Sequence, residues 1–337
     1  MAEPPVLAVP PYRAPRWLPG PHAQTIWPAL FAPRPSVPFE RSTWDTPDGD
    51  FVEIDEAVGA GPADAGSPLL VLFHGLEGGS RSHYARALSA AALSSGWRAA
   101  VVHFRGCGGS PNRAPRAYHS GDSDEIDWVL ARMRDTHARG APLYAVGVSL
   151  GGNVLLKWLG ERGPAASHVR AAVAVSPPQD LQAGADALAC GFNRVYTHNF
   201  LATLKRKSLG MLERHPGLVD ADRVAAARTL AEFDDAVTAP LHGFSDARDY
   251  YRRASCKQYL PGITVPTLVV NARNDPFLPA SALAGPTEVS SAVALCYPDE
   301  GGHVGFATGA PPGRLDWLPA AVFGFFDALG AGASSQA

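Results

Sequence analysis

The sequence predicts an α/β protein with a mostly parallel sheet, helices on both faces of that sheet and an inserted helical cap. From residue 68 onward, short continuous apolar runs alternate with helical stretches, a pattern typical of parallel strands joined by crossover helices. The interval 178–260 is far longer than the roughly twelve residues that a crossover needs, so it indicates an insertion. With 337 residues, 46% of them apolar, the chain can bury a large core.

We expect residues 1–47 to form a proline-rich N-terminal arm. They hold twelve of the 31 prolines, which disfavours long helices and predicts an extended arm. Large aromatic residues, including Trp17 and Trp44, indicate that the arm packs on the body and is not a disordered tail. Pro47-Asp48-Gly49-Asp50 then predicts a tight turn that opens the first strand pair.

The α/β core is expected to occupy residues 48–177 and 261–330. Its strands are predicted by apolar runs at residues 69–73, 99–104, 143–146, 171–175, 267–270 and 292–296. These runs lack polar alternation, which indicates strands buried on both faces. Helices are predicted at residues 82–95, 122–139, from 150 onward and 315–329. Residues 178–260 are expected to form the helical cap, and residues 331–337 a disordered tail.

Charge and composition argue against several kinds of partner. Twenty-nine basic against 32 acidic residues give a net charge of −3, and a nucleic-acid binder usually carries a basic excess. No stretch reaches about 18 uninterrupted apolar residues, so no transmembrane segment is expected. The proline-rich start does not resemble a secretory signal, so we expect a cytoplasmic protein. The four cysteines and eleven histidines show no metal-ligand spacing, so neither a metal nor a cofactor is expected, and the oligomeric state stays open.

A candidate nucleophile lies where the third apolar run meets a helix, in Gly147-Val148-Ser149-Leu150-Gly151. A serine that attacks a carbonyl must stand clear of the sheet on a sharp strand-to-helix turn. That turn strains the backbone of the serine, and small residues two positions away on either side give it clearance. Ser149 is therefore the predicted nucleophile.

Serine needs a base to take its proton, and in this architecture acid and base follow it in the order serine, acid, histidine. His303 is the only histidine after Asp275, and each of the two follows one of the last two predicted strands. Asp299 and Glu300 compete with Asp275 for the role of the acid. Because both share the loop of His303, they would struggle to reach the far nitrogen of its imidazole, and Asp275 is preferred.

The same reaction needs donors for an oxyanion. The backbone N–H of Leu150, at a helix N-terminus, is one expected donor. The second is expected from the loop after the first buried strand, where the N–H of Leu76 lies between flexible glycines. His74, in the same loop, precedes the serine in chain order and is expected to support the loop and not to act as the base.

Motifs spread along nearly the whole chain resemble the YheT-like branch of the α/β-hydrolase superfamily, also called AB hydrolase superfamily family 4. They are Pro21-His22-Ala23-Gln24-Thr25, His74-Gly75-Leu76-Glu77-Gly78, His103-Phe104-Arg105-Gly106-Cys107, Tyr118-His119-Ser120-Gly121, Gly147 to Gly152, Glu232-Phe233-Asp234-Asp235 and Gly301-Gly302-His303-Val304-Gly305-Phe306. The resemblance implies an α/β-hydrolase fold, carboxylic-ester hydrolysis and a charge relay on Ser149, Asp275 and His303. Eukaryotic relatives carry an N-terminal membrane anchor, which the proline-rich arm does not match.

The sequence thus predicts a serine esterase that acts on a small-molecule or lipid-like ester, with cap aromatics along the acyl pocket. A serine thioesterase or amidase remains an alternative, because the same relay serves other acyl groups. A catalytically silent binding module remains a second alternative. The arginines near Arg105-Gly106-Cys107 could bind an anionic group of a substrate, although a loop braced by arginine hydrogen bonds is the preferred interpretation.

Overall fold

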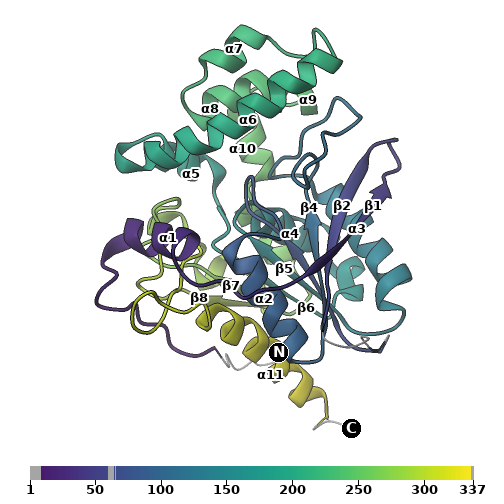
Figure 1. Cartoon of the computed structure of the whole chain (residues 1–337), viewed down its shortest axis with the longest axis vertical. Coiled ribbons are helices and arrows are strands. Elements are labelled where there is room, and N and C mark those ends of the chain that lie inside the picture. The colour runs from purple at the N-terminus through teal and green to yellow at the C-terminus, as the bar shows by residue number, and fades with distance from the viewer. Residues whose placement is uncertain (1–8, 60–63, 65, 335–337) are drawn as a thin grey trace.

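A computed structural model describes residues 9–59, 64 and 66–334 (Figure 1). Its centre is an eight-stranded sheet in the order β1-β2-β4-β3-β5-β6-β7-β8. The strands are β1 (Phe39–Asp45), β2 (Phe51–Ala57), β3 (Leu69–Phe73), β4 (Arg98–His103), β5 (Leu143–Val148), β6 (Ala171–Val175), β7 (Thr267–Val270) and β8 (Val293–Cys296). β2 pairs antiparallel with both β1 and β4, and all other neighbouring strands pair parallel, so the predicted fold class is confirmed.

Helices cover both faces of the sheet, because alternate residues of each buried strand point to opposite sides. In β3, Leu69, Val71 and Phe73 join one core and Leu70 and Leu72 the other. The first core packs under α3 (Ser123–Arg132) and α4 (Leu150–Arg162), and the second under α2 (His83–Ser94) and α11 (Trp317–Ser334).

The proline count predicted an extended arm, but the arm is not extended throughout. It contains helix α1 (Gly20–Leu30), with Pro28 in its interior and Pro21 in its first turn. A proline there costs nothing, because the first N–H groups of a helix have no acceptor inside it. Trp27 Nε1 donates to the Pro312 carbonyl at 2.8 Å and anchors the helix on the body.

Two further helix boundaries differ from the prediction. The helix expected over 122–139 is regular only as far as Arg132, and residues Met133–Ala138 form a wider π-helical turn. α11 continues to Ser334, into the segment expected to be disordered, while residues 335–337 lie outside the described part.

Between β6 and β7, the chain forms a layer of helices over one end of the body (Figure 1). These are α5 (Leu181–Leu188), α6 (Arg194–Arg214), α7 (Ala221–Ala226), α8 (Leu230–Phe233), α9 (Ala239–His242) and α10 (Ala247–Ala254). They have small apolar cores of their own, one centred on Tyr250 and Tyr251 and one on Phe233 and Val237. Across residues 9–59, 64 and 66–334, no helix has the length and apolarity to span a bilayer.

Candidate functional site

Ser149 occupies a strained turn between β5 and α4. Its φ of 52° and ψ of −119° lie in a region that residues with a Cβ rarely adopt. The turn depends on the glycines two positions before and after Ser149. A Cβ on Gly147 would overlap the backbone of Gly151, and a Cβ on Gly151 would overlap the carbonyl of Phe73.

The structure brings Ser149, His303 and Asp275 together at the carboxyl ends of β5, β8 and β7. His303 Nε2 lies 2.9 Å from Ser149 Oγ, and His303 Nδ1 lies 2.8 Å from Asp275 Oδ2. A carboxylate accepts, so Nδ1 carries the proton and Nε2 accepts from the serine hydroxyl. The Asp275 side chain is 1% exposed and that of His303 is 10% exposed. An imidazole held in this way can take a proton from the hydroxyl.

The competing carboxylates lie away from the imidazole. The side chain of Asp299 is 93% exposed and faces Arg273 at 3.7 Å. Glu300 accepts a hydrogen bond from Gln24 Nε2 at 3.1 Å. Of the three candidate acids, the geometry therefore pairs Asp275 with His303.

The loop after β3 lies directly against the serine. A Cβ on Gly75 would come within 3.1 Å of Ser149 Cβ, so the absence of a side chain at Gly75 lets the backbone lie close to the serine. Leu76 and Leu150 both line the cavity next to Ser149. Leu150 is the first residue of α4, whose N–H has no acceptor within the helix. Within the described residues, the N–H of Leu76 makes no backbone hydrogen bond either.

His74 stabilises the loop after β3 through two hydrogen bonds of its imidazole ring. Its Nδ1–H donates to the Gly75 carbonyl at 2.7 Å, and its Nε2 accepts from the N–H of Phe104 at 3.2 Å. Full burial lowers the pKa of His74 to about 3, so the ring is neutral at physiological pH. Both ring nitrogens are occupied, which leaves none for a proton transfer.

Glu77, the residue after Leu76 in this loop, links the body to the cap. Its backbone is left-handed, with a φ of 56°, and its N–H donates to the hydroxyl of Tyr118 at 2.9 Å. Its carboxylate accepts from Tyr118 at 2.8 Å and pairs with Lys207 of α6 at 2.8 Å. The loop that carries Leu76 is therefore held from the body and from the cap.

The arm reaches the site through two residues to which the sequence had assigned no role. Thr25 Oγ1 accepts from the backbone N–H of His303 at 2.9 Å. Gln24 Oε1 accepts from the N–H of Gly301 and from Asn274 Nδ2, both at 2.9 Å. The available signal was the Pro21–Thr25 motif itself, but its contacts span more than 200 residues of sequence.

Ser149 and His303 open into a cavity of about 1520 Å³ that continues under the cap. The cap contributes Tyr196, Phe200, Phe233, Tyr250 and Tyr251 to its aromatic lining, and the body contributes Phe39, Tyr84, Tyr118 and Phe277. Two other cap aromatics, Phe192 and Phe244, do not line the cavity. Phe192 is 51% exposed, and Phe244 packs against the ring of His119. A large, mainly apolar enclosure beside a polar reactive group is typical of a small-molecule site.

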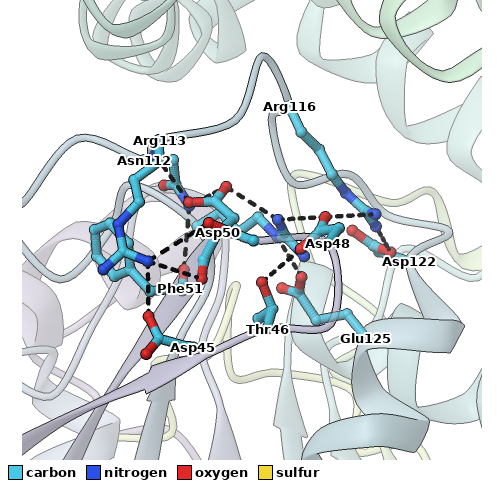
Figure 2. Close-up of polar contacts among 12 residues, drawn as sticks. Asp45, Thr46, Asp48, Asp50, Phe51, Asn112, Arg113, Arg116, Asp122 and Glu125 are labelled. Carbon is cyan, nitrogen blue, oxygen red and sulfur yellow. Dashed lines mark hydrogen bonds and ion pairs between the residues drawn. The ribbon is translucent and has the colours of Figure 1, made fainter.

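The arginine-rich loop after β4 is braced by acids, as preferred from the sequence (Figure 2). Buried Arg105 pairs with Asp50 at 3.0 Å and with Glu125 at 2.5 Å. Arg113 pairs with Asp45 at 2.7 Å, and Arg116 with Asp122 at 2.5 Å. Each guanidinium already has a carboxylate partner, which leaves little reason to assign the loop to an anionic substrate.

Comparison with known proteins gives a consistent result. A family model described as alpha/beta hydrolase fold matches residues 68–310. The chain is 39% identical over 304 residues to the protein named Putative esterase YheT of Escherichia coli (strain K12), which covers 89% of this chain and 88% of that protein. It is 29% identical to Phospholipase ABHD3 of Mus musculus, over 91% of this chain and 75% of that protein. The solved esterase Pf2001 of Pyrococcus furiosus superposes with a TM-score of 0.56 at 16% identity, covering 95% of this chain and 97% of that one.

Proposed function

The chain belongs to the α/β-hydrolase family, and on that premise we propose that it is a serine hydrolase of carboxylic esters. One observation carries the proposal. Two consecutive hydrogen bonds, of 2.9 and 2.8 Å, join Ser149 to His303 and His303 to Asp275 at the edge of an apolar cavity. A fold alone does not specify a reaction, whereas this arrangement of nucleophile, base and acid is suited to acyl transfer.

In the proposed reaction, Ser149 Oγ attacks the ester carbonyl while His303 Nε2 takes the hydroxyl proton. The N–H groups of Leu76 and Leu150 stabilise the negative oxygen of the tetrahedral intermediate. Asp275 holds the imidazole in the required tautomer and stabilises its positive charge. His303 then gives its proton to the departing alcohol, which leaves an acyl-serine.

The second half of the reaction uses the same groups. His303 takes a proton from a water molecule, whose oxygen attacks the acyl carbonyl. The tetrahedral intermediate collapses, the proton returns to Ser149 and the carboxylic acid leaves. The mechanism needs no redox step, because both halves only exchange one oxygen substituent of the acyl carbon for another.

The cavity lining supports an acyl chain as the part of the substrate that is bound. Apolar surface from the cap faces the nucleophile, and burial of each methylene group contributes about 0.8 kcal/mol. The relatives named esterase and phospholipase act on esters by their names, and we extend that substrate class to this chain.

A fluorophosphonate probe tests the proposal, because it reacts only with an activated serine. We expect the wild-type protein to be labelled and to hydrolyse p-nitrophenyl esters, and Ser149→Ala to do neither while keeping its melting temperature. Loss of one member of such a relay commonly costs ~10⁴-fold or more in rate. Ser110→Ala, on an exposed loop, is the matched control and should behave as wild type. Full labelling of Ser149→Ala, or no labelling of the wild type, would contradict the proposal.

A further inference from the structure

We propose that Gln24 and Thr25 of α1 are positioning residues that hold the His303 loop in its reactive geometry. The inference rests on the proposed function, since it assigns a role relative to the proposed base. It gives the N-terminal arm a part in catalysis beyond packing on the body. In Figure 1, α1 lies beside the loops that follow β7 and β8, which carry Asp275 and His303.

Thr25 contacts the base residue directly. Its hydroxyl donates to the Pro21 carbonyl at 2.7 Å, which fixes the direction of the proton. The lone pairs of Oγ1 then face the loop, and one accepts from the backbone N–H of His303 at 2.9 Å. Thr25 is 7% exposed, so no water can readily replace it. The hydroxyl thus fixes the backbone nitrogen of the residue whose side chain must align with Ser149.

Gln24 joins the two loops that carry base and acid. The residue is 1% exposed, and both polar atoms of its side-chain amide have hydrogen-bond partners. Nε2 donates to the Leu18 carbonyl at 3.0 Å and to Glu300 at 3.1 Å, so Oε1 must be the atom that faces the loops. Oε1 accepts from the N–H of Gly301 and from Asn274 Nδ2, both at 2.9 Å.

Asn274 completes the connection between the loops. It directly precedes Asp275, and its Oδ1 accepts from the N–H of Gly302 at 3.0 Å. One hydrogen-bonded network therefore runs from the arm, through Asn274, to the residue before His303. A shift of α1 would disturb the acid loop and the base loop together.

The loop that carries His303, here called the base loop, needs such external support because its backbone is strained. Val304 and Phe306 have φ values of 58° and 42°, which residues with a Cβ adopt only when the surroundings enforce them. The loop also lies directly on the backbone of α1. A Cβ on Gly305 would overlap the Gln24 carbonyl oxygen, and a Cβ on Gly302 would come within 2.8 Å of the Gln24 carbonyl carbon.

Proton transfer from Ser149 to His303 is sensitive to geometry, so a displaced base loop should slow catalysis. Displacement of a reacting group by about 1 Å can lower the rate about 100-fold, even when the altered residue never touches substrate. Removal of the Thr25 hydroxyl leaves the N–H of His303 without its acceptor, and the strained loop then loses one of the contacts that define it. Thr25 lines the cavity, but valine keeps the shape of its side chain, so we expect the loss to fall on turnover more than on substrate binding.

The decisive experiment compares Thr25→Val with Thr25→Ser in the full-length protein, on a short p-nitrophenyl ester. Valine has the shape of threonine but no hydroxyl, whereas serine keeps the hydroxyl and loses only a methyl group. We expect Thr25→Val to lower kcat about 10- to 100-fold with KM within threefold of wild type, and to slow fluorophosphonate labelling in parallel. Thr25→Ser should stay within threefold of wild type in kcat. Gln24→Met, which removes both acceptor bonds to the loops, should lower kcat at least as much.

Trp27→Phe is the matched control. It removes an arm-to-body hydrogen bond, to the Pro312 carbonyl, that does not touch the base loop, and it should leave kcat within twofold of wild type. The inference is wrong if Thr25→Val keeps wild-type kcat, or if Thr25→Val and Thr25→Ser lose kcat equally. Either result leaves the proposed function intact as long as Ser149→Ala is inactive. An unlabelled wild-type protein would overturn the proposed function and this inference with it.

Discussion

The phenyl ring of Phe277 stacks on the imidazole of His303, with 4.0 Å between the ring centroids and 22° between the ring planes. The backbone N–H of Phe277 also donates to Asp275 Oδ1 at 2.8 Å. One residue therefore contacts the proposed acid through its backbone and the proposed base through its side chain. The ring restricts rotation of the imidazole and shields one of its faces from water.

Phe277→Leu is expected to lower kcat about tenfold, because an aliphatic side chain leaves the imidazole free to rotate away from Ser149. The backbone hydrogen bond to Asp275 remains, so the acid keeps its position. Steady-state kinetics on a short ester, with circular dichroism as a check of folding, would measure the effect. An unchanged kcat would show that Asp275 alone is sufficient to orient the ring.

Asp275→Asn and Asp299→Asn separate the two candidate acids. Asparagine at 275 should favour the wrong tautomer of His303 and lower kcat about 10⁴-fold, as the equivalent substitution does in serine proteases. Asparagine at 299 removes an exposed charge 3.7 Å from Arg273 and should change kcat less than twofold. Rates for both variants on the same ester decide the matter. The reverse order of losses would assign the acid to Asp299.

Much of this site could be predicted because it depends on local sequence and strand order. Parallel strands place their carboxyl ends on one edge of the sheet, so residues after β5, β7 and β8 must converge there. The glycine at 147 is dictated locally, since a Cβ there would overlap the backbone of Gly151, whereas the glycine at 151 is required by the backbone of Phe73 in the neighbouring strand β3.

The contacts of the arm could not be predicted in the same way. Helix α1 begins at Gly20 with a proline in its first turn, and a count of prolines does not distinguish that position from a helix interior. The bonds from Gln24 and Thr25 to the base loop depend on tertiary packing across more than 270 residues. The pairing of Lys207 with Glu77 likewise depends on how the cap docks, which no local pattern specifies.

The buried carboxyl group of Asp234 should make the folding stability of the protein depend on pH. Burial at the cavity wall raises its pKa to about 6, although Thr238 and Tyr251 donate hydrogen bonds to it. Between about pH 4 and 6, the folded protein therefore binds more protons at Asp234 than the unfolded chain does, so this residue makes stability fall as pH rises.

Asp234→Asn should remove this contribution, because asparagine is neutral throughout. The variant should become more stable relative to wild type as the pH rises from 4 to 7, by about 2 kcal/mol. Denaturant unfolding of both proteins at several pH values measures the difference, in which all other titrating groups cancel. A difference that does not change with pH would show that Asp234 is ionised in the folded protein at pH 4.

Substitution of Phe200 in α6 and of Phe192 just before α6 tests whether the cap sets the preference for acyl-chain length. Phe200 lines the cavity and packs edge-on against Phe277 at 6.0 Å, whereas Phe192 does not line the cavity and is 51% exposed. Phe200→Ala should enlarge the cavity beside Phe277 and shift the kcat/KM optimum toward longer p-nitrophenyl esters by about two to four carbons. Each additional methylene that becomes buried contributes about 0.8 kcal/mol, or roughly fourfold in kcat/KM. Phe192→Ala should leave the profile unchanged, because its ring faces solvent and His22. If both variants keep the wild-type profile, the acyl chain binds in another part of the cavity. If both variants shift the profile equally, the effect arises from the stability of the cap and not from the shape of the cavity lining.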